Sequence, residues 1–180
     1  YLCENNLKIL QLLSEEIFEA SDSMTSAKTA YAKDSLRKEC SQIFDLFMFI
    51  FEASQKHSLI NATLVTLQRF ISWIPMEYIF ETTLLDALFK LLVVPPLRVE
   101  TVNCLIEVNS LSARQMHQKY HISVKRMMTT FVTQLSAQIP NDASLLAKAY
   151  ATGSFEECLF VQRVALFLTT FLRIHINLFL

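Results

Sequence analysis

The sequence predicts an all-α fold, an α-solenoid in which antiparallel helical hairpins pack side by side. Three observations predict this class. The 180 residues include a single glycine, Gly153, and four prolines, although a typical soluble chain of this length contains about a dozen glycines. Apolar residues, 52% of the chain, recur at helical spacing in most segments. The segments are joined by short connections, whereas a sheet protein would need many more glycine and proline turns.

The first half of the chain shows three helical segments. Apolar residues at i, i+3 and i+7 predict a helix over about Leu2–Ala20. After a polar interval, a long helix is expected over about Lys28–Ala53, with a strongly apolar second half. The next helix, about Ser58–Trp73, is expected to stop at Pro75, because proline lacks the amide hydrogen and its ring clashes with the preceding turn.

Two shorter helices are expected in the middle of the chain. Thr83–Val94 carries leucines on one helical stripe, and the pair Pro95–Pro96 ends it. The helix that follows, about Leu97–Val108, has an apolar stripe of its own. Because the connection between them is so short, the two helices should be antiparallel neighbours.

The last third of the chain begins and ends with a long helix. The residues Ser112–Gln115 have the form of a capping box, which predicts a helix over about Ala113–Gln138. A short helix is expected near Asp142–Tyr150, followed by a flexible break at Gly153. A second capping box then opens the final helix, about Ser154–Asn177.

Pairing consecutive helices yields three hairpin units. They occupy residues 28–74, 81–109 and 113–177, while residues 1–20 would be the second helix of a preceding repeat. Their unequal lengths exclude the strict periods of tetratricopeptide and ankyrin arrays, and irregular two-helix units of about 40 residues are typical of HEAT-type repeats. Each unit leaves an apolar face uncovered, which predicts a solenoid fragment cut from a longer array. A globular helical bundle is the alternative architecture.

The composition argues against catalytic, cofactor and metal sites. One glycine cannot form a phosphate-binding loop, a dinucleotide fingerprint or a nucleophile elbow. The pairs Glu15–Glu16 and Glu156–Glu157 are adjacent in helices, so their carboxylates point about 100° apart and do not converge on one bond. His117 and His121 share a helix face, but two ligands without a nearby third do not make a metal site. We therefore expect no catalysis, no cofactor and no metal.

Charge and hydropathy argue against nucleic acid and membrane as direct partners. The net charge of −1 gives no general attraction to polyanions, and Lys125–Arg126 is an isolated basic pair. A spanning helix needs about 18 or more apolar, uncharged residues. The most apolar stretches are Ile43–Phe51, which Asp45 interrupts, and Val164–Leu172, which Arg173 follows directly. We expect no direct nucleic-acid binding and no membrane insertion.

Cysteine and phenylalanine are both expected in the core. The four cysteines have neither zinc-ligand nor redox-motif spacing and lie in apolar helical contexts at Cys3, Cys40, Cys104 and Cys158. Buried, reduced thiols in an intracellular protein are the simplest interpretation. The fourteen phenylalanines fall at helical spacing, which is typical of core packing.

Several strings also resemble a known family, in the same order along nearly the whole chain. They are Glu4–Glu16 (ENNLKILQLLSEE), Ser72–Thr82 (SWIPMEYIFET), Cys104–Glu107 (CLIE) and Ala165–Leu172 (ALFLTTFL). These strings resemble the amino-terminal HEAT region of the nuclear exportins that recognise leucine-rich export signals. Those receptors are karyopherins, members of the importin-beta superfamily.

This resemblance implies a superhelical transport receptor without enzymatic activity. In that family Ran-GTP and export-signal cargo bind cooperatively, and phenylalanine-glycine nucleoporins guide passage through the nuclear pore. The resemblance thus implies a receptor that shuttles between nucleus and cytoplasm. The family's cargo groove lies in later repeats, so no cargo-contacting or other partner-binding residue can be assigned in this chain.

Two other interpretations of the residues stay open at this point. One is a generic helical-repeat scaffold for protein–protein interaction, unrelated to nuclear transport. The other is a helical enzyme or lipid carrier whose apolar excess lines a cavity.

Overall fold

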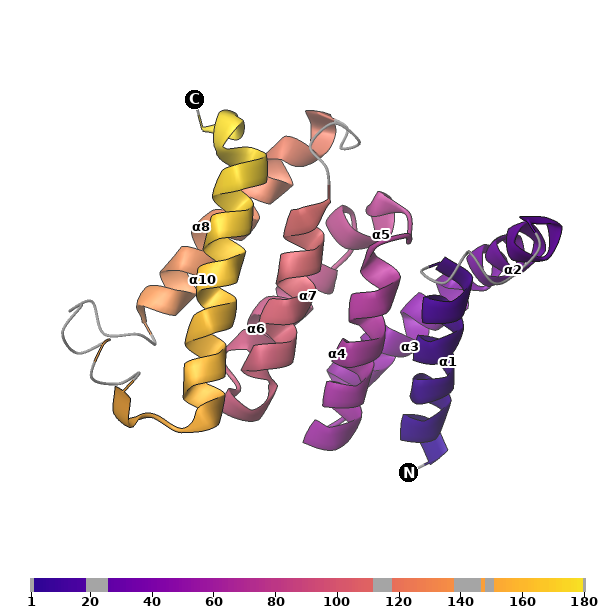
Figure 1. The fold of residues 1–180 in the computed structure, drawn as a ribbon, viewed down its shortest axis with the longest axis horizontal. Helices are drawn as coiled ribbons and strands as arrows, with labels where there is room; N and C mark the ends of the chain where they lie inside the picture. Colours follow the sequence, from indigo (N-terminus) through magenta and orange to yellow (C-terminus); the bar gives the residue numbers. More distant parts are fainter. Residues whose placement is uncertain (1, 19–25, 112–117, 138–146, 148–150, 180) are drawn as a thin grey trace. The chain divides into compact units, whose positions relative to one another are not determined.

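The computed structural model describes residues 2–18, 26–111, 118–137, 147 and 151–179. Within these ranges the chain forms helices and turns, and no described residue lies in a strand. The chain divides into two compact units, Tyr1–Ala87 and Leu88–Leu180. The predicted all-α class is confirmed (Figure 1).

In the described residues of the first unit there are five helices and the start of a sixth. The five are α1 (Leu2–Phe18), α2 (Ser26–Lys38), α3 (Cys40–Ala53), α4 (His57–Ile71) and α5 (Met76–Phe80). The sixth, α6, comprises Leu84–Leu92 and continues into the second unit.

The expected long helix Lys28–Ala53 is wrong in one respect, because Glu39 separates α2 from α3. Glu39 keeps a right-handed helical conformation as the N-cap of α3, with φ −86° and ψ −1°. The interruption is therefore slight, and neither proline nor glycine marks it in the sequence. α3 then packs against α4, where the Phe47 and Phe70 rings meet edge to face with centroids 5.5 Å apart.

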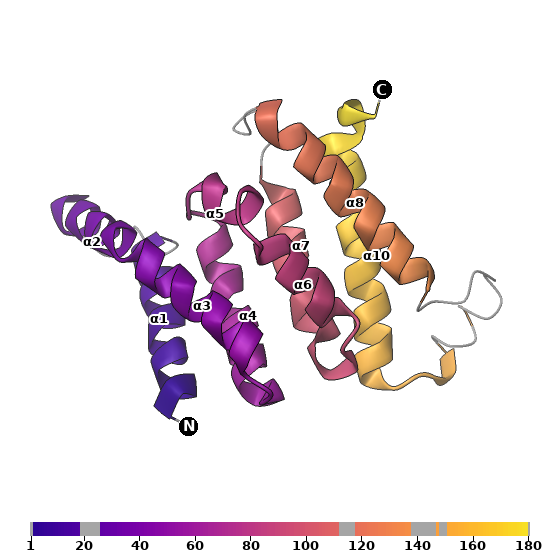
Figure 2. The same cartoon turned by 180° about the vertical axis from the view of Figure 1, so that it is seen from behind.

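After the end of α6, the described residues of the second unit form three longer helices and three short 3₁₀ turns. They are, in chain order, η1 (Pro95–Leu97), α7 (Arg98–Ser110), η2 (Gln118–Tyr120), α8 (His121–Ser136), α10 (Phe155–His175) and η3 (Ile176–Leu178). Its core contains a run of aromatic rings, since the Phe131 centroid lies 3.9 Å from Phe167, which in turn lies 6.4 Å from Phe171. This contact joins α8 to α10, which cross in Figure 2.

One expectation for the second unit needs correction, and two others concern residues that the structure does not describe, apart from Ala147. The α-helix expected from Ala113 begins at His121, and the 3₁₀ turn η2 precedes it. Its supposed capping box, Ser112–Gln115, lies outside the described residues, as does the short helix expected at Asp142–Tyr150 except for Ala147, which is helical.

The capping box at the start of α10 is confirmed. The Ser154 hydroxyl accepts a hydrogen bond from the Glu157 amide (3.3 Å), and the Glu157 carboxylate accepts one from the Ser154 amide (2.8 Å). Two amides of the first turn that lack partners within the helix are thereby satisfied. Gly153 lies at the bend just before this cap, and its φ is not positive. The turn therefore does not depend on glycine's left-handed conformation.

Ser154→Ala should lower the free energy of unfolding by about 1 kcal/mol, because it removes the oxygen that caps the Glu157 amide. Thermal unfolding followed by circular dichroism measures the effect. Thr129→Ala is the matched control, because Thr129 is exposed and its hydroxyl donates to the Lys125 carbonyl within the same helix. Equal losses in the two variants would show that the cap does not stabilise α10.

One helical segment in the described residues, Phe155–Leu178, is long and apolar enough to cross a membrane by length and composition alone. The expectation that all apolar stretches are too short is therefore wrong for this segment. A core helix passes the same test, and α10 buries one stripe, formed by Phe160, Val164, Phe167 and Phe171, against the rest of its unit. The length of the segment is thus weak support for a membrane span.

Candidate functional site

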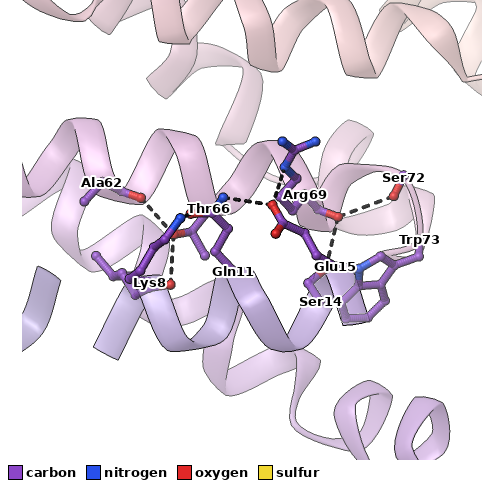
Figure 3. A network of polar contacts seen from close by, with 10 residues as sticks. Lys8, Gln11, Ser14, Glu15, Ala62, Thr66, Arg69, Ser72 and Trp73 are labelled. Carbon is purple, nitrogen blue, oxygen red and sulfur yellow. Dashed lines mark hydrogen bonds and ion pairs between the residues drawn. The ribbon is translucent and has the colours of Figure 1, made fainter. Parts of the chain in front are cut away.

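The most distinctive polar features of the structure are hydrogen bonds between helices that are far apart in sequence. In the first unit they join α1 to α4, and Figure 3 shows most of them. The Trp73 indole Nε1–H donates to Ser14 Oγ at 2.9 Å, and the Ser14 hydroxyl donates in turn to the Arg69 carbonyl at 3.2 Å. Because Ser14 is buried, the loss of either partner would leave a buried polar group unsatisfied and would destabilise the fold. The chain of bonds ties the C-terminal end of α4 to α1.

Charged side chains continue the same contact on its more exposed side. Arg69 Nε lies 2.9 Å from Glu15 Oε1, and the Gln11 amide donates to the same carboxylate oxygen at 2.9 Å. Lys8 Nζ donates to Gln11 Oε1 at 3.0 Å (Figure 3). Gln11 is buried, so its amide links the half-buried ion pair to the apolar contact between the helices.

Near the N-terminal end of α1, the Glu4 carboxylate contacts residues at the start of α4. Glu4 Oε1 accepts hydrogen bonds from Ser58 Oγ (2.7 Å) and Lys56 Nζ (3.0 Å). The Ser58 bond, followed by the Lys56 ammonium, lowers the pKa of Glu4 from 4.5 to about 2. Glu4 therefore stays ionised well into the acid range.

These contacts show that α1 and α4 run parallel. The early residue Glu4 meets Ser58, and the late residue Ser14 meets Trp73, so positions advance in the same direction on both helices. The paired residues are 54 and 59 positions apart in sequence. Parallel neighbours require an intervening element that runs back, and here α2 and α3 provide it. This is the packing expected of equivalent helices in successive hairpin repeats.

The second unit repeats this arrangement with α7 and α10. The Asn109 side-chain amide donates to the Phe167 carbonyl at 2.9 Å, and His175 Nε2 donates to the Asn109 carbonyl at 2.9 Å. At the other end of the pair, the Arg98 guanidinium lies 4.4 Å from the centroid of the Phe160 ring. The early residues of α7 and α10 again contact each other, and so do their late residues. The two helices are therefore parallel, with α8 between them in sequence.

His175 is the buried titratable group of this interface. A carbonyl oxygen only accepts, so Nε2 carries the hydrogen, and Nδ1 is buried without a hydrogen-bond partner among the described residues. Burial lowers the pKa of His175 below 6.5, and the nearby His121 on α8 lowers it further, although the bond to Asn109 opposes the shift. The imidazole is therefore neutral in the folded protein at neutral pH.

This histidine should make stability depend on pH. Because its pKa is lower folded than unfolded, its contribution is present above about pH 6.5 and is lost as the pH falls below that value. Between pH 7 and 5 the free energy of unfolding should fall less steeply for His175→Gln than for the wild type. Urea unfolding at several pH values measures these slopes, with the exposed His57→Gln as control. A slope equal to that of the wild type would contradict the assignment.

Both α1 and α10 carry exposed apolar side chains. On α1 Leu2, Ile9, Leu12 and Leu13 form a row on one side of the helix, and α10 exposes Leu166, Leu172 and Ile176. Each of these helices already buries its other side. Exposed apolar side chains that lie close together are typical of packing interfaces.

The residues that sequence analysis considered for chemistry are not brought together. Glu15 pairs with Arg69, and Glu157 completes the α10 cap. His117 lies outside the described residues, and within the described ranges no group of three or more His, Cys, Asp or Glu side chains could hold a metal ion. The geometry of the described residues therefore presents helix interfaces rather than a cluster of reactive groups.

The cysteine prediction holds for two of the four residues. Cys40 and Cys104 are buried, and burial raises the pKa of both thiols. Cys3 is exposed and Cys158 is half-buried, so the expectation of burial is wrong for these two. All four are free thiols. Among the described residues eight phenylalanines are buried, as expected for a core, at positions 44, 47, 70, 89, 131, 160, 167 and 171.

Comparison with known proteins shows which family this sequence is similar to. A family model described as "Exportin 1-like protein" matches residues 1–105. Protein EXPORTIN 1A of Arabidopsis thaliana is 42% identical over 177 residues, which is 98% of this chain and 16% of that protein. Exportin-1 of Schizosaccharomyces pombe is 40% identical over 178 residues (98% and 16%), and Exportin-1 of Drosophila melanogaster is 40% identical over 176 residues (97% and 16%).

The chain thus spans 16% of the length of these relatives. The match nevertheless runs along nearly the whole chain and includes proteins from a plant, a fungus and an insect. This sequence match agrees with the observed fold, in which helices pack in parallel pairs. The chain belongs to the exportin 1-like family.

Proposed function

We propose that this chain is part of a nuclear export receptor that carries proteins with leucine-rich export signals from nucleus to cytoplasm together with Ran-GTP. One observation carries the proposal: identity of about 40% over 97–98% of the chain to proteins named exportin-1. The helical-repeat packing supports it, because stacked hairpins provide long surfaces for protein partners. In this proposal the segment has no catalytic role.

Within the receptor, the segment would be a structural part of the repeat array. Residues 1–20 would be the second helix of a preceding repeat, and residues 28–74, 81–109 and 113–177 would form the following repeats. The parallel packing of α1 on α4 and of α7 on α10 supports this division, because the second helices of successive repeats would lie side by side in the same way. The exposed apolar side chains of α1 and α10 would pack against the adjoining repeats of the complete receptor.

The partners would act on the complete receptor. Ran-GTP and cargo would bind largely through repeats outside this segment, and phenylalanine-glycine nucleoporins would guide the complex through the pore. The segment would then connect the Ran-binding and cargo-binding parts, and small rotations at each helix–helix contact would add up along the array. Shuttling between nucleus and cytoplasm follows from this role.

Equilibrium binding tests the proposal. Fluorescence anisotropy would report the affinity of the complete receptor for a labelled leucine-rich export-signal peptide, alone, with Ran-GTP and with Ran-GDP. Ran-GTP should tighten binding about tenfold or more, within the usual range of coupling between sites, and Ran-GDP should have no effect. A peptide with its leucines replaced by alanine is the control. Equal affinity with and without Ran-GTP would contradict the proposed function and favour a scaffold unrelated to export.

A further inference from the structure

The contact between α7 and α10, which lie side by side in Figure 1, contains two buried hydrogen-bond acceptors that the proposed function does not explain. Asn109 and His175 are 0% and 1% exposed. Each uses its donor, since the Asn109 amide donates to the Phe167 carbonyl and His175 Nε2 donates to the Asn109 carbonyl, both at 2.9 Å. The atoms Asn109 Oδ1 and His175 Nδ1 are buried and have no hydrogen-bond partner among the described residues. We call these two atoms the acceptor pair.

The neighbouring carbonyls determine which atoms of the two side chains accept. If the Asn109 amide were turned over, Oδ1 would face the Phe167 carbonyl, and two acceptors would repel each other. If the imidazole hydrogen were on Nδ1, Nε2 would become an acceptor facing the Asn109 carbonyl. Neither exchange therefore gives the acceptor pair a donor while keeping the bonds that join α7 to α10.

A buried acceptor without a donor destabilises a fold, and native structures rarely leave one in that state. The two acceptors belong to residues that are hydrogen-bonded to each other, so one small ligand with two donors can serve both. Water is the smallest such ligand, and waters that bridge buried polar groups are a regular part of protein interiors. Both side chains lie in the close-packed interior of the unit, where the Phe171 ring packs beside the imidazole. Water therefore fits this place better than a larger donor.

We propose that one buried water molecule donates hydrogen bonds to both Asn109 Oδ1 and His175 Nδ1. All four polar side-chain atoms of the two residues would then be bonded. The water would add a third polar link between α7 and α10, nearly as favourable as a direct hydrogen bond. A metal ion fits less well, since the described residues contain no group of three or more His, Cys, Asp or Glu side chains able to hold one.

A crystal structure of the complete receptor at about 2 Å resolution or better tests the proposal. Electron density should show one peak about 2.6–3.2 Å from both atoms of the acceptor pair. The same peak should be lost in His175→Gln, because glutamine can keep a donor for the Asn109 carbonyl but places no ring nitrogen at the Nδ1 position. The matched control is His57→Gln at an exposed position, which should leave the peak unchanged.

Other results would contradict the buried water. They are no peak beside the acceptor pair, a protein donor within hydrogen-bond distance of either atom, a peak that persists in His175→Gln, and a peak about 2.1 Å from Nδ1, which is the distance of a metal ligand. If His175→Gln does not fold, the density of the wild type decides alone. The measurement needs neither Ran-GTP nor an export-signal peptide, so the proposed function and the buried water can fail independently.

Discussion

Replacing Phe167 by alanine is expected to lower the free energy of unfolding of the second unit by about 3–5 kcal/mol, the usual cost of truncating a fully buried phenylalanine. Phe167 is completely buried, and its ring contacts Phe131 of α8 and Phe171 of α10. Truncation would leave a cavity where α7, α8 and α10 meet, since Asn109 of α7 also bonds to the Phe167 carbonyl. Urea unfolding followed by circular dichroism measures the loss.

The matched control is Phe155→Ala, at the first residue of the same helix, where the ring is 82% exposed. Truncation there removes little buried surface, so the free energy of unfolding should change by less than about 0.5 kcal/mol. Similar losses in the two variants would show that the aromatic core does not hold α8 against α10.

The second large effect is expected from Asn109→Asp, about 3 kcal/mol of lost stability at pH 7. This nearly isosteric change replaces the donor to the Phe167 carbonyl by a carboxylate, at a completely buried position. An uncompensated buried charge is costly, and two acceptors would then face each other. Lowering the pH should recover part of the loss, because a protonated carboxyl can donate a hydrogen bond again.

Urea unfolding at pH 7 and pH 5 measures both parts of this prediction. Asn177→Asp introduces the same charge at an exposed position in the same unit, and it should cost less than about 1 kcal/mol. A stable Asn109→Asp variant at pH 7 would mean that the Asn109 bond does not hold α7 to α10.

Structural features that depend on residues close together in the sequence could be predicted from the sequence alone. Helical periodicity indicated most helices, and the cap of α10 follows from Ser154 and Glu157, which are three residues apart. The break at Glu39 was missed because Glu39 is an ordinary helix residue in a helical conformation. The later start of α8 was missed because a 3₁₀ turn has nearly the same local pattern as an α-helix.

The bonds between helices could not be predicted, because their partners are far apart in sequence. Ser14 and Trp73 are separated by 59 residues, and Asn109 and His175 by 66. A single polar residue among apolar ones is compatible with many partners until the helices are placed. The one available signal was a polar residue on an otherwise apolar stripe, as at Ser14 and Asn109, which indicates a buried hydrogen bond but not its partner.

The family resemblance, by contrast, depended on short identical strings rather than on physical pattern. The string Ser72–Thr82 includes Trp73, which forms one of the hydrogen bonds between the end of α4 and α1. Composition alone distinguished a helical protein from a strand-rich one, but it could not separate an export receptor from another helical scaffold. That distinction needed the comparison with exportins.

The proposal that this segment connects Ran binding to cargo binding is tested most directly in the complete receptor. The measurement is the ratio of export-signal peptide affinities with and without Ran-GTP, for the wild type and for Trp73→Phe. Trp73→Phe keeps an aromatic ring beside Phe70 but removes the donor to Ser14. Thr133→Ala is the control, because Thr133 is exposed and its hydroxyl donates to the Thr129 carbonyl within α8. We expect Trp73→Phe to reduce the ratio about threefold or more, and a ratio equal to that of the wild type would contradict the proposed connection.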